Sequence, residues 1–217
     1  MLRLLGKEPS AVLLAVQLGA VLLYPFLEGQ GTGQAVFAIL GIVVLGMVML
    51  AVRATPALTW VALLLGIPAT VLLVIEAFAG TEGLLAYSSA LEALLYFYAA
   101  YALIAYMLAD HEITRDELFA VGATFTLVAW GFAHVYTLWQ EIEPHSFVAA
   151  VNSDSPRTWM ELLFLSFTTL SSTGLSDIVP IDPFARSLCM IEQVAGVAYI
   201  AVVVSRLVAL TIPRPRA

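Results

Sequence analysis

Long apolar stretches, separated by short segments rich in glycine, proline and charge, run along the whole chain. A membrane-spanning helix needs about 20 mostly apolar residues. Six stretches meet or approach that length, at about 11–26, 35–52, 58–78, 84–108, 117–139 and 184–210. A seventh apolar stretch, about 156–170, is too short to cross. The pattern predicts an all-α polytopic membrane protein with six transmembrane helices and one re-entrant helix.

Composition agrees with this assignment, and the basic residues predict an orientation. The chain of 217 residues is 61% hydrophobic and only 12% charged, whereas soluble domains average roughly 25% charged residues. If the N-terminus is cytoplasmic, the predicted helices divide the lysines and arginines unequally. Seven fall on the cytoplasmic side: Arg3, Lys7, Arg53, Arg115, Arg206, Arg214 and Arg216. Only Arg157 and Arg186 fall outside, so both termini are expected in the cytoplasm.

Several function classes find no support in the sequence. The sequence contains no basic patch of the kind that indicates a nucleic-acid partner. The single cysteine, Cys189, excludes an internal disulfide and a multi-cysteine metal site. No nucleophile elbow or phosphate-binding loop is present. We therefore expect no enzymatic activity and no bound cofactor. We expect membrane lipid to surround the helices.

The re-entrant segment carries the chemistry. Ser155 is expected to cap its helix, with Pro156 at the first helical position. After about residue 170 the chain becomes a run of small hydroxyl residues around Gly174 and leaves through Pro180. Irregular backbone at membrane depth is tolerated only where protein buries it or it lines an aqueous path. An ordinary surface loop is the alternative.

An ion filter is the functional interpretation of this run. Backbone carbonyls can replace an ion's hydration shell when successive residues alternate in handedness and point their oxygens at one axis. Glycine permits the left-handed backbone that this requires, and Ser/Thr hydroxyls add oxygen ligands. One loop cannot enclose an ion. Several copies around an axis are therefore expected, which implies a closed symmetric oligomer.

Residues 166–180 read Ser-Phe-Thr-Thr-Leu-Ser-Ser-Thr-Gly-Leu-Ser-Asp-Ile-Val-Pro. This string resembles the signature of bacterial potassium channels, Ser-Phe-x-Thr-Leu-Thr-Thr-Val-Gly-Tyr-Gly-Asp-x-x-Pro, in register and without a gap. The resemblance implies a homotetramer in a bacterial-type inner membrane, with potassium or another monovalent cation as the permeant ion. It also implies a four-helix peripheral domain over 1–112 and a pore domain over 113–217.

The resemblance assigns the filter to seven consecutive positions: Ser171, Ser172, Thr173, Gly174, Leu175, Ser176 and Asp177. The alkali cation would lie at Ser172, Thr173 and Gly174. Leu175 replaces the usual tyrosine. Ser176 replaces a glycine, where a left-handed backbone costs roughly 1–2 kcal/mol. We therefore expect one or two inner carbonyl sites below a wider mouth ringed by Asp177.

These replacements leave the ion open. The string Ser-Thr-Gly-Leu-Ser is also similar to the pore loops of Trk/Ktr potassium transporters, which keep one glycine per loop, so potassium remains the first expectation. Weakly selective monovalent conduction is the near alternative. A non-conducting scaffold or sensor on a degenerate pore fold is the alternative of a different class.

Three further residues are candidates for supporting roles. Glu161 and Glu192 could brace the filter from behind, because carboxylates in apolar segments are expensive and mark functional sites. Gly196 could bend the last helix. The fourth stretch, 84–108, contains no arginine or lysine, so we expect gating without steep voltage dependence.

Overall fold

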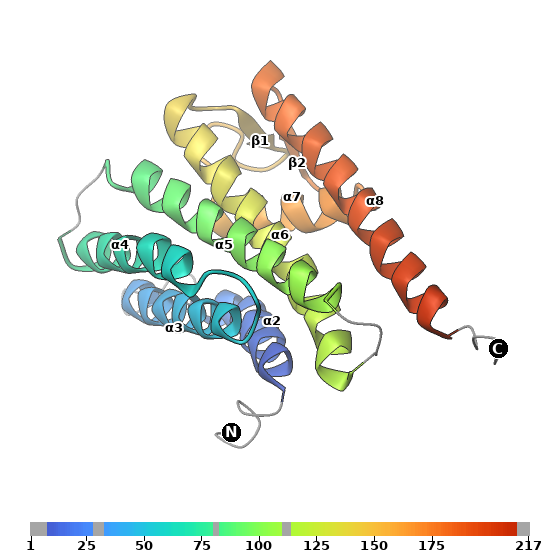
Figure 1. The fold of residues 1–217 in the computed structure, drawn as a ribbon. Coiled ribbons are helices and arrows are strands. Elements are labelled where there is room, and N and C mark those ends of the chain that lie inside the picture. The colour runs from blue at the N-terminus through green and yellow to red at the C-terminus, as the bar shows by residue number, and fades with distance from the viewer. Residues whose placement is uncertain (1–7, 28–32, 80–82, 110–113, 212–217) are drawn as a thin grey trace, which may run out of the picture.

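The computed structural model describes residues 8–27, 33–79, 83–109 and 114–211. Seven helices and two short strands occur in these ranges (Figure 1). In chain order they are α2 (Pro9–Leu27), α3 (Gly33–Arg53), α4 (Thr59–Ala79), α5 (Leu85–Met107), α6 (Arg115–Ile142), β1 (Phe147–Ala149), α7 (Trp159–Leu170), β2 (Ile178–Pro180) and α8 (Pro183–Thr211). Each helix coincides with one of the predicted apolar stretches to within a few residues.

Among the described residues, five helices are long and apolar enough to cross a membrane. Their spans are Pro9–Phe26, Thr59–Glu76, Leu85–Met107, Arg115–Ile142 and Pro183–Arg206. In α3 the apolar segment found among the described residues is shorter, Ile39–Arg53, and α7 is shorter still. The chain is therefore a multi-pass helical membrane protein.

The predicted start of the re-entrant helix was wrong by three residues. The helix begins at Trp159, and Thr158 is its N-cap. The Thr158 hydroxyl accepts the backbone N–H of Glu161, and the Glu161 carboxylate accepts that of Thr158. This reciprocal capping box satisfies two otherwise orphaned donors. Thr158 caps the helix instead of the predicted Ser155, because only Thr158 has a glutamate three positions later.

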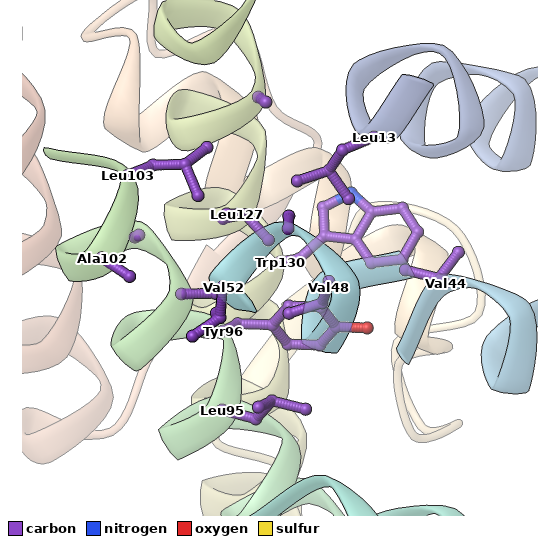
Figure 2. Packing of buried hydrophobic residues seen from close by; sticks show 14 of the residues in the cluster. Leu13, Val44, Val48, Val52, Leu95, Tyr96, Ala102, Leu103, Leu127 and Trp130 are labelled. Atoms are coloured by element: carbon purple, nitrogen blue, oxygen red, sulfur yellow. The ribbon is translucent and has the colours of Figure 1, made fainter. Parts of the chain in front are cut away.

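One apolar core joins the N-terminal helices to α6. Figure 2 shows residues from this cluster, with Leu13 of α2, Val48 of α3, Leu95 of α5 and Leu127 of α6 meeting in one place. Polar contacts reinforce the packing: the backbone N–H and the hydroxyl of Ser10 both donate to Asp116. The predicted domain boundary at 112/113 lies outside the described residues, and the helices on either side of it pack closely.

A small antiparallel sheet, which the all-α prediction missed, joins the loop before α7 to the chain after residues 171–177, the predicted filter segment. Its register pairs Phe147 with Pro180 and Ala149 with Ile178. Phe147, Ala149 and Ile178 are buried in a second core with Tyr136 and Leu162. The sheet therefore anchors the outgoing end of the filter segment to α6 and α7.

Candidate functional site

Helix α7 and residues 171–177 after it form the candidate site. Glu161 lies in the first turn of α7, at the end away from the filter segment. Its carboxylate serves the capping box and pairs with the Arg157 guanidinium at 3.3 Å. Glu161 thus secures the start of this helix. Support of the filter by Glu161 remains a prediction. Such support would act through α7 and not through a direct contact.

Helix α7 ends in a left-handed turn that opens the filter segment. The N–H of Ser172 donates to the carbonyl of Thr169 at 3.0 Å, and the N–H of Thr173 donates to that of Thr168 at 3.0 Å. This pair of bonds is the Schellman motif, which places the residue after the C-cap in the left-handed region. Ser172 occupies that position with φ +59°. Glycine usually stands here, because a Cβ raises the energy of this conformation by roughly 1–2 kcal/mol.

Handedness alternates over the next two residues. Gly174 has φ +66°, Ser172 has φ +59°, and Thr173 between them is not in the positive-φ region. The Thr168 carbonyl also accepts the N–H of Gly174 at 3.1 Å. The hydroxyls of Ser171 and Thr173 lie 3.0 Å apart. Residues 172–174 therefore have the alternation that a carbonyl ring requires, and all three are exposed on the surface of the single chain.

The alternation stops beyond Gly174. Ser176 is not in the positive-φ region, as expected for a residue with a Cβ. Its hydroxyl instead accepts the N–H of Ile178 at 3.0 Å, which turns the chain toward β2. Leu175 is 77% exposed and Asp177 is also exposed. The outer half of the segment thus has a different backbone from the inner half.

Glu192 joins the three helices of the C-terminal part behind the filter segment. Its side chain is fully buried. One carboxyl oxygen accepts the Tyr136 hydroxyl of α6, and the other contacts the Ser166 hydroxyl of α7. Ser166 also donates to the Ala129 carbonyl at 2.8 Å. Because a serine hydroxyl has one hydrogen, a proton on Glu192 would satisfy every member of this network.

Sequence reasoning named Glu192 but missed Tyr136 and Ser166. Ser166 was visible only as part of the family string, and Tyr136 carried no local signal because it is 56 positions from its partner. The network ties Glu192 to α7, which would be the pore helix of the predicted channel. Its effect on the filter remains a prediction.

Gly196 lies where α8 passes the end of α7. A Cβ built at Gly196 would overlap the backbone carbonyl of Leu170, the last residue of α7. Glycine is therefore required here for close approach of two backbones. Helix α8 runs without interruption from Pro183 to Thr211, and the predicted bend at Gly196 stays a prediction.

Comparison with known proteins bears on the same part of the chain. Residues 123–212 match a protein-family model described as an ion channel. The match supports the assignment of the chain as an ion channel. It covers most of α6, the filter segment and α8, which are the elements that the geometry brings together. No curated protein and no solved structure matches the chain.

Proposed function

We propose that the chain forms a homotetrameric cation channel that passes potassium through a filter made by residues 171–177. The observation that carries the proposal is the alternating backbone of Ser172, Thr173 and Gly174, exposed at the end of a capped helix. Four such segments around an axis would turn their carbonyls toward one ion path. The ion-channel match over residues 123–212 supports the same assignment.

In this proposal the inner positions, Ser172 to Gly174, hold the dehydrated cation. The segment then widens at Leu175, and Asp177 supplies negative charge at the mouth. Six crossings with both termini in the cytoplasm would bring the start of α7 to the outer face. A bacterial-type inner membrane is the proposed location, by resemblance of the filter string.

Weakly selective monovalent conduction is the second candidate, and one observation favours it. The backbone at Ser176 lacks the left-handed conformation, so the filter would offer fewer consecutive carbonyl rings than a chain with two glycines. Selectivity depends on the number and field of coordinating oxygens. Fewer rings would therefore weaken the preference for potassium over sodium.

Flux from reconstituted vesicles tests the proposal. Purified protein in liposomes with opposed potassium and sodium gradients should give a flux above that of empty vesicles. A reversal potential set by the potassium gradient supports potassium selectivity, and a value near zero supports the weakly selective channel. Absence of flux in a correctly assembled tetramer would favour the non-conducting scaffold.

The Gly174→Ala variant should lose most of this flux, because Gly174 has φ +66° and no atom of its own chain beyond the two adjacent residues lies within 4 Å of a methyl group there. The cost is then conformational and falls on the filter alone. Gly19→Ala is the matched control, since a Cβ at Gly19 in α2 also meets nothing within 4 Å. Equal flux from both variants would contradict a role for the left-handed backbone.

A further inference from the structure

A cavity of about 460 Å³ lies between the N-terminal helices and the start of α7. Its walls come from α3, α4, α5, α6 and residues 156–159. Three carboxylates contribute to its lining: Glu76 of α4, Glu92 of α5 and Glu141 near the end of α6. Ionisable groups within membrane-spanning helices are costly and mark ligand or ion sites by default. None of these carboxylates belongs to the filter.

Glu92 is the most deeply placed of the three. It is 5% exposed, and the Nδ1 atom of His134 lies 2.9 Å from one of its carboxyl oxygens. That contact lacks the alignment of a hydrogen bond, and the Nδ1 atom has no hydrogen-bond partner. No other described hydrogen bond reaches Glu92. A buried carboxylate is expected to accept several hydrogen bonds, so Glu92 can accept donors from a ligand.

The remaining charges in the lining leave the cavity negative. Arg157 is the one arginine among the described lining residues. Its buried Nε has no hydrogen-bond partner there, whereas its two Nη atoms are engaged elsewhere. It donates to the carbonyls of Val151 and Asn152 and pairs with Glu161. The Ser88 hydroxyl donates to Glu76 at 2.8 Å, which leaves the rest of that carboxylate as an acceptor. Three carboxylates thus face one arginine among the described lining residues, which favours a cationic ligand over an anionic one.

Aromatic side chains complete the walls. Tyr96, Trp130 and Trp159 all contribute to the lining, and aromatic faces attract ammonium and guanidinium groups. A bare metal ion fits less well, because no group of three His, Cys, Asp or Glu side chains close enough to hold one occurs among the described residues. The volume is also in the range of small-molecule sites, about 300–1,000 Å³.

We propose that this cavity binds an organic cation with N–H donors, an alkylammonium or guanidinium group, whose charge pairs with Glu92 and Glu76. A second hollow of about 270 Å³ shares Gln140, Glu141 and Pro156 with the cavity. Its other walls, Pro144 and His145, are exposed, which gives an approach from the loop after α6. The cation comes either from solution or from the headgroup of an aminophospholipid.

The site adjoins the proposed pore. Trp159, the first residue of α7, packs against His134 and Trp130 with ring centroids 5.5 and 5.1 Å apart. An occupant of the cavity would therefore act on the start of the pore helix. This link to conduction rests on the proposed channel function, whereas binding itself does not.

Binding of methylguanidinium to the full-length protein in phosphatidylglycerol vesicles tests the proposal, with tryptophan fluorescence and Tm as readouts. Methylurea, its neutral isostere, is the ligand control and should not bind. Glu92→Gln should raise the Kd by about tenfold or more, because a buried charge partner is lost. Glu141→Gln, at a more exposed carboxylate, should weaken it by about twofold.

Two matched variants keep the test specific. Glu143→Gln changes an exposed carboxylate outside the lining and should bind like the wild type. Thr173→Val alters the filter and should also bind like the wild type, because the probe is expected in the cavity. Loss of binding in Thr173→Val, or binding of methylurea as strong as that of methylguanidinium, overturns the proposal.

A lipid arm separates the two sources of the cation. Protein from vesicles that contain phosphatidylethanolamine is examined by native mass spectrometry. Retention of this lipid by the wild type but not by Glu92→Gln, with no binding of the soluble probe, supports the site with a headgroup as its ligand. Absence of both lipid retention and probe binding overturns the proposal. Because no flux is measured, a non-conducting protein would leave these outcomes unchanged.

Discussion

Gly196 is a single residue on which the approach of two helices depends. Gly196→Ala would place a methyl group against the Leu170 carbonyl, and backbone atoms cannot move aside as a side-chain tip can. Overpacking of this kind costs typically about 1–3 kcal/mol. We expect a lower Tm and, in the proposed channel, a lower flux. Gly46→Ala, where a Cβ meets nothing within 4 Å, should leave the Tm nearly unchanged or raise it.

Asp182 caps α8, and its charge makes this cap dependent on pH. Its carboxylate accepts the backbone N–H groups of Ala185 and Phe184 and the indole N–H of Trp139. The Ala185 hydrogen bond is the main cause that lowers the Asp182 pKa, with Trp139, Phe184 and the nearby Arg186 adding to it. Because the folded-state pKa lies below the unfolded value of about 3.9, the cap stabilises the fold above that pH.

Asp182→Ala should therefore lower the Tm at neutral pH. The difference from the wild type should shrink as the pH falls below about 4, through the lowered pKa of the folded protein. Scanning fluorimetry at a series of pH values measures this. Asp154→Ala, which removes an exposed aspartate bonded only to its neighbour Ser153 in the described hydrogen bonds, is the control. A pH-independent difference would contradict the assignment.

At the scale of elements, Glu192 holds α6, α7 and α8 together through Tyr136 and Ser166. Glu192→Leu would leave these hydroxyls without their shared partner, at a cost of about 1–3 kcal/mol for each buried group left unpaired. We expect a clear drop in Tm. Glu192→Gln should be milder, because its amide can accept from Tyr136 and donate to Ser166.

A double-mutant cycle measures the coupling directly. Tyr136→Phe and Glu192→Leu should cost less together than the sum of their separate effects, because they remove the same hydrogen bond. Additive effects on the Tm would show that Tyr136 and Glu192 act independently. Flux measured on the same variants reports whether the network supports the filter, as predicted from the sequence.

For the whole molecule, most of the apolar surface of α8 has no partner within the chain, and this helix lies along one flank of the structure (Figure 1). Only 17% of its apolar span is buried within the chain. If part of this surface packs in the proposed tetramer, native mass spectrometry should give four times the 23.3 kDa of one chain. Val194→Asn on α8 should then shift the protein toward smaller species, since an interface would bury an unpaired amide.

The comparison variant is Leu64→Asn, which changes a similarly exposed residue on α4. Val194 is 70% exposed and Leu64 is 62% exposed in the single chain. Because α4 belongs to the periphery in the proposed arrangement, the assembly should tolerate this change. Dissociation by Leu64→Asn but not by Val194→Asn would contradict the placement of α8 toward the axis.

By itself the sequence determined the helices and the membrane class, and it located the irregular segment that follows α7. Hydrophobic length and breaker residues act locally, so stretches such as 84–108 were predictable as α5 to within a residue or two. The cost of a left-handed backbone is also local, and Ser176 avoids it as its Cβ predicts, whereas Ser172 adopts φ +59° despite its Cβ because the turn at the end of α7 holds it there. The two short strands were missed because Phe147 and Pro180 stabilise one another only once they are brought together.

Only the tertiary structure decided which polar residues meet. Tyr136, Ser166 and Glu192 lie on three helices, and Glu92 and His134 on two, so no spacing along the chain marks these groups as partners. The tertiary structure also showed that Gly196 allows the end of α7 to approach α8 closely, whereas the sequence predicted only a bend there. The reason is that burial and hydrogen bonding of a polar group depend on what packs against it, and that is a property of the folded chain.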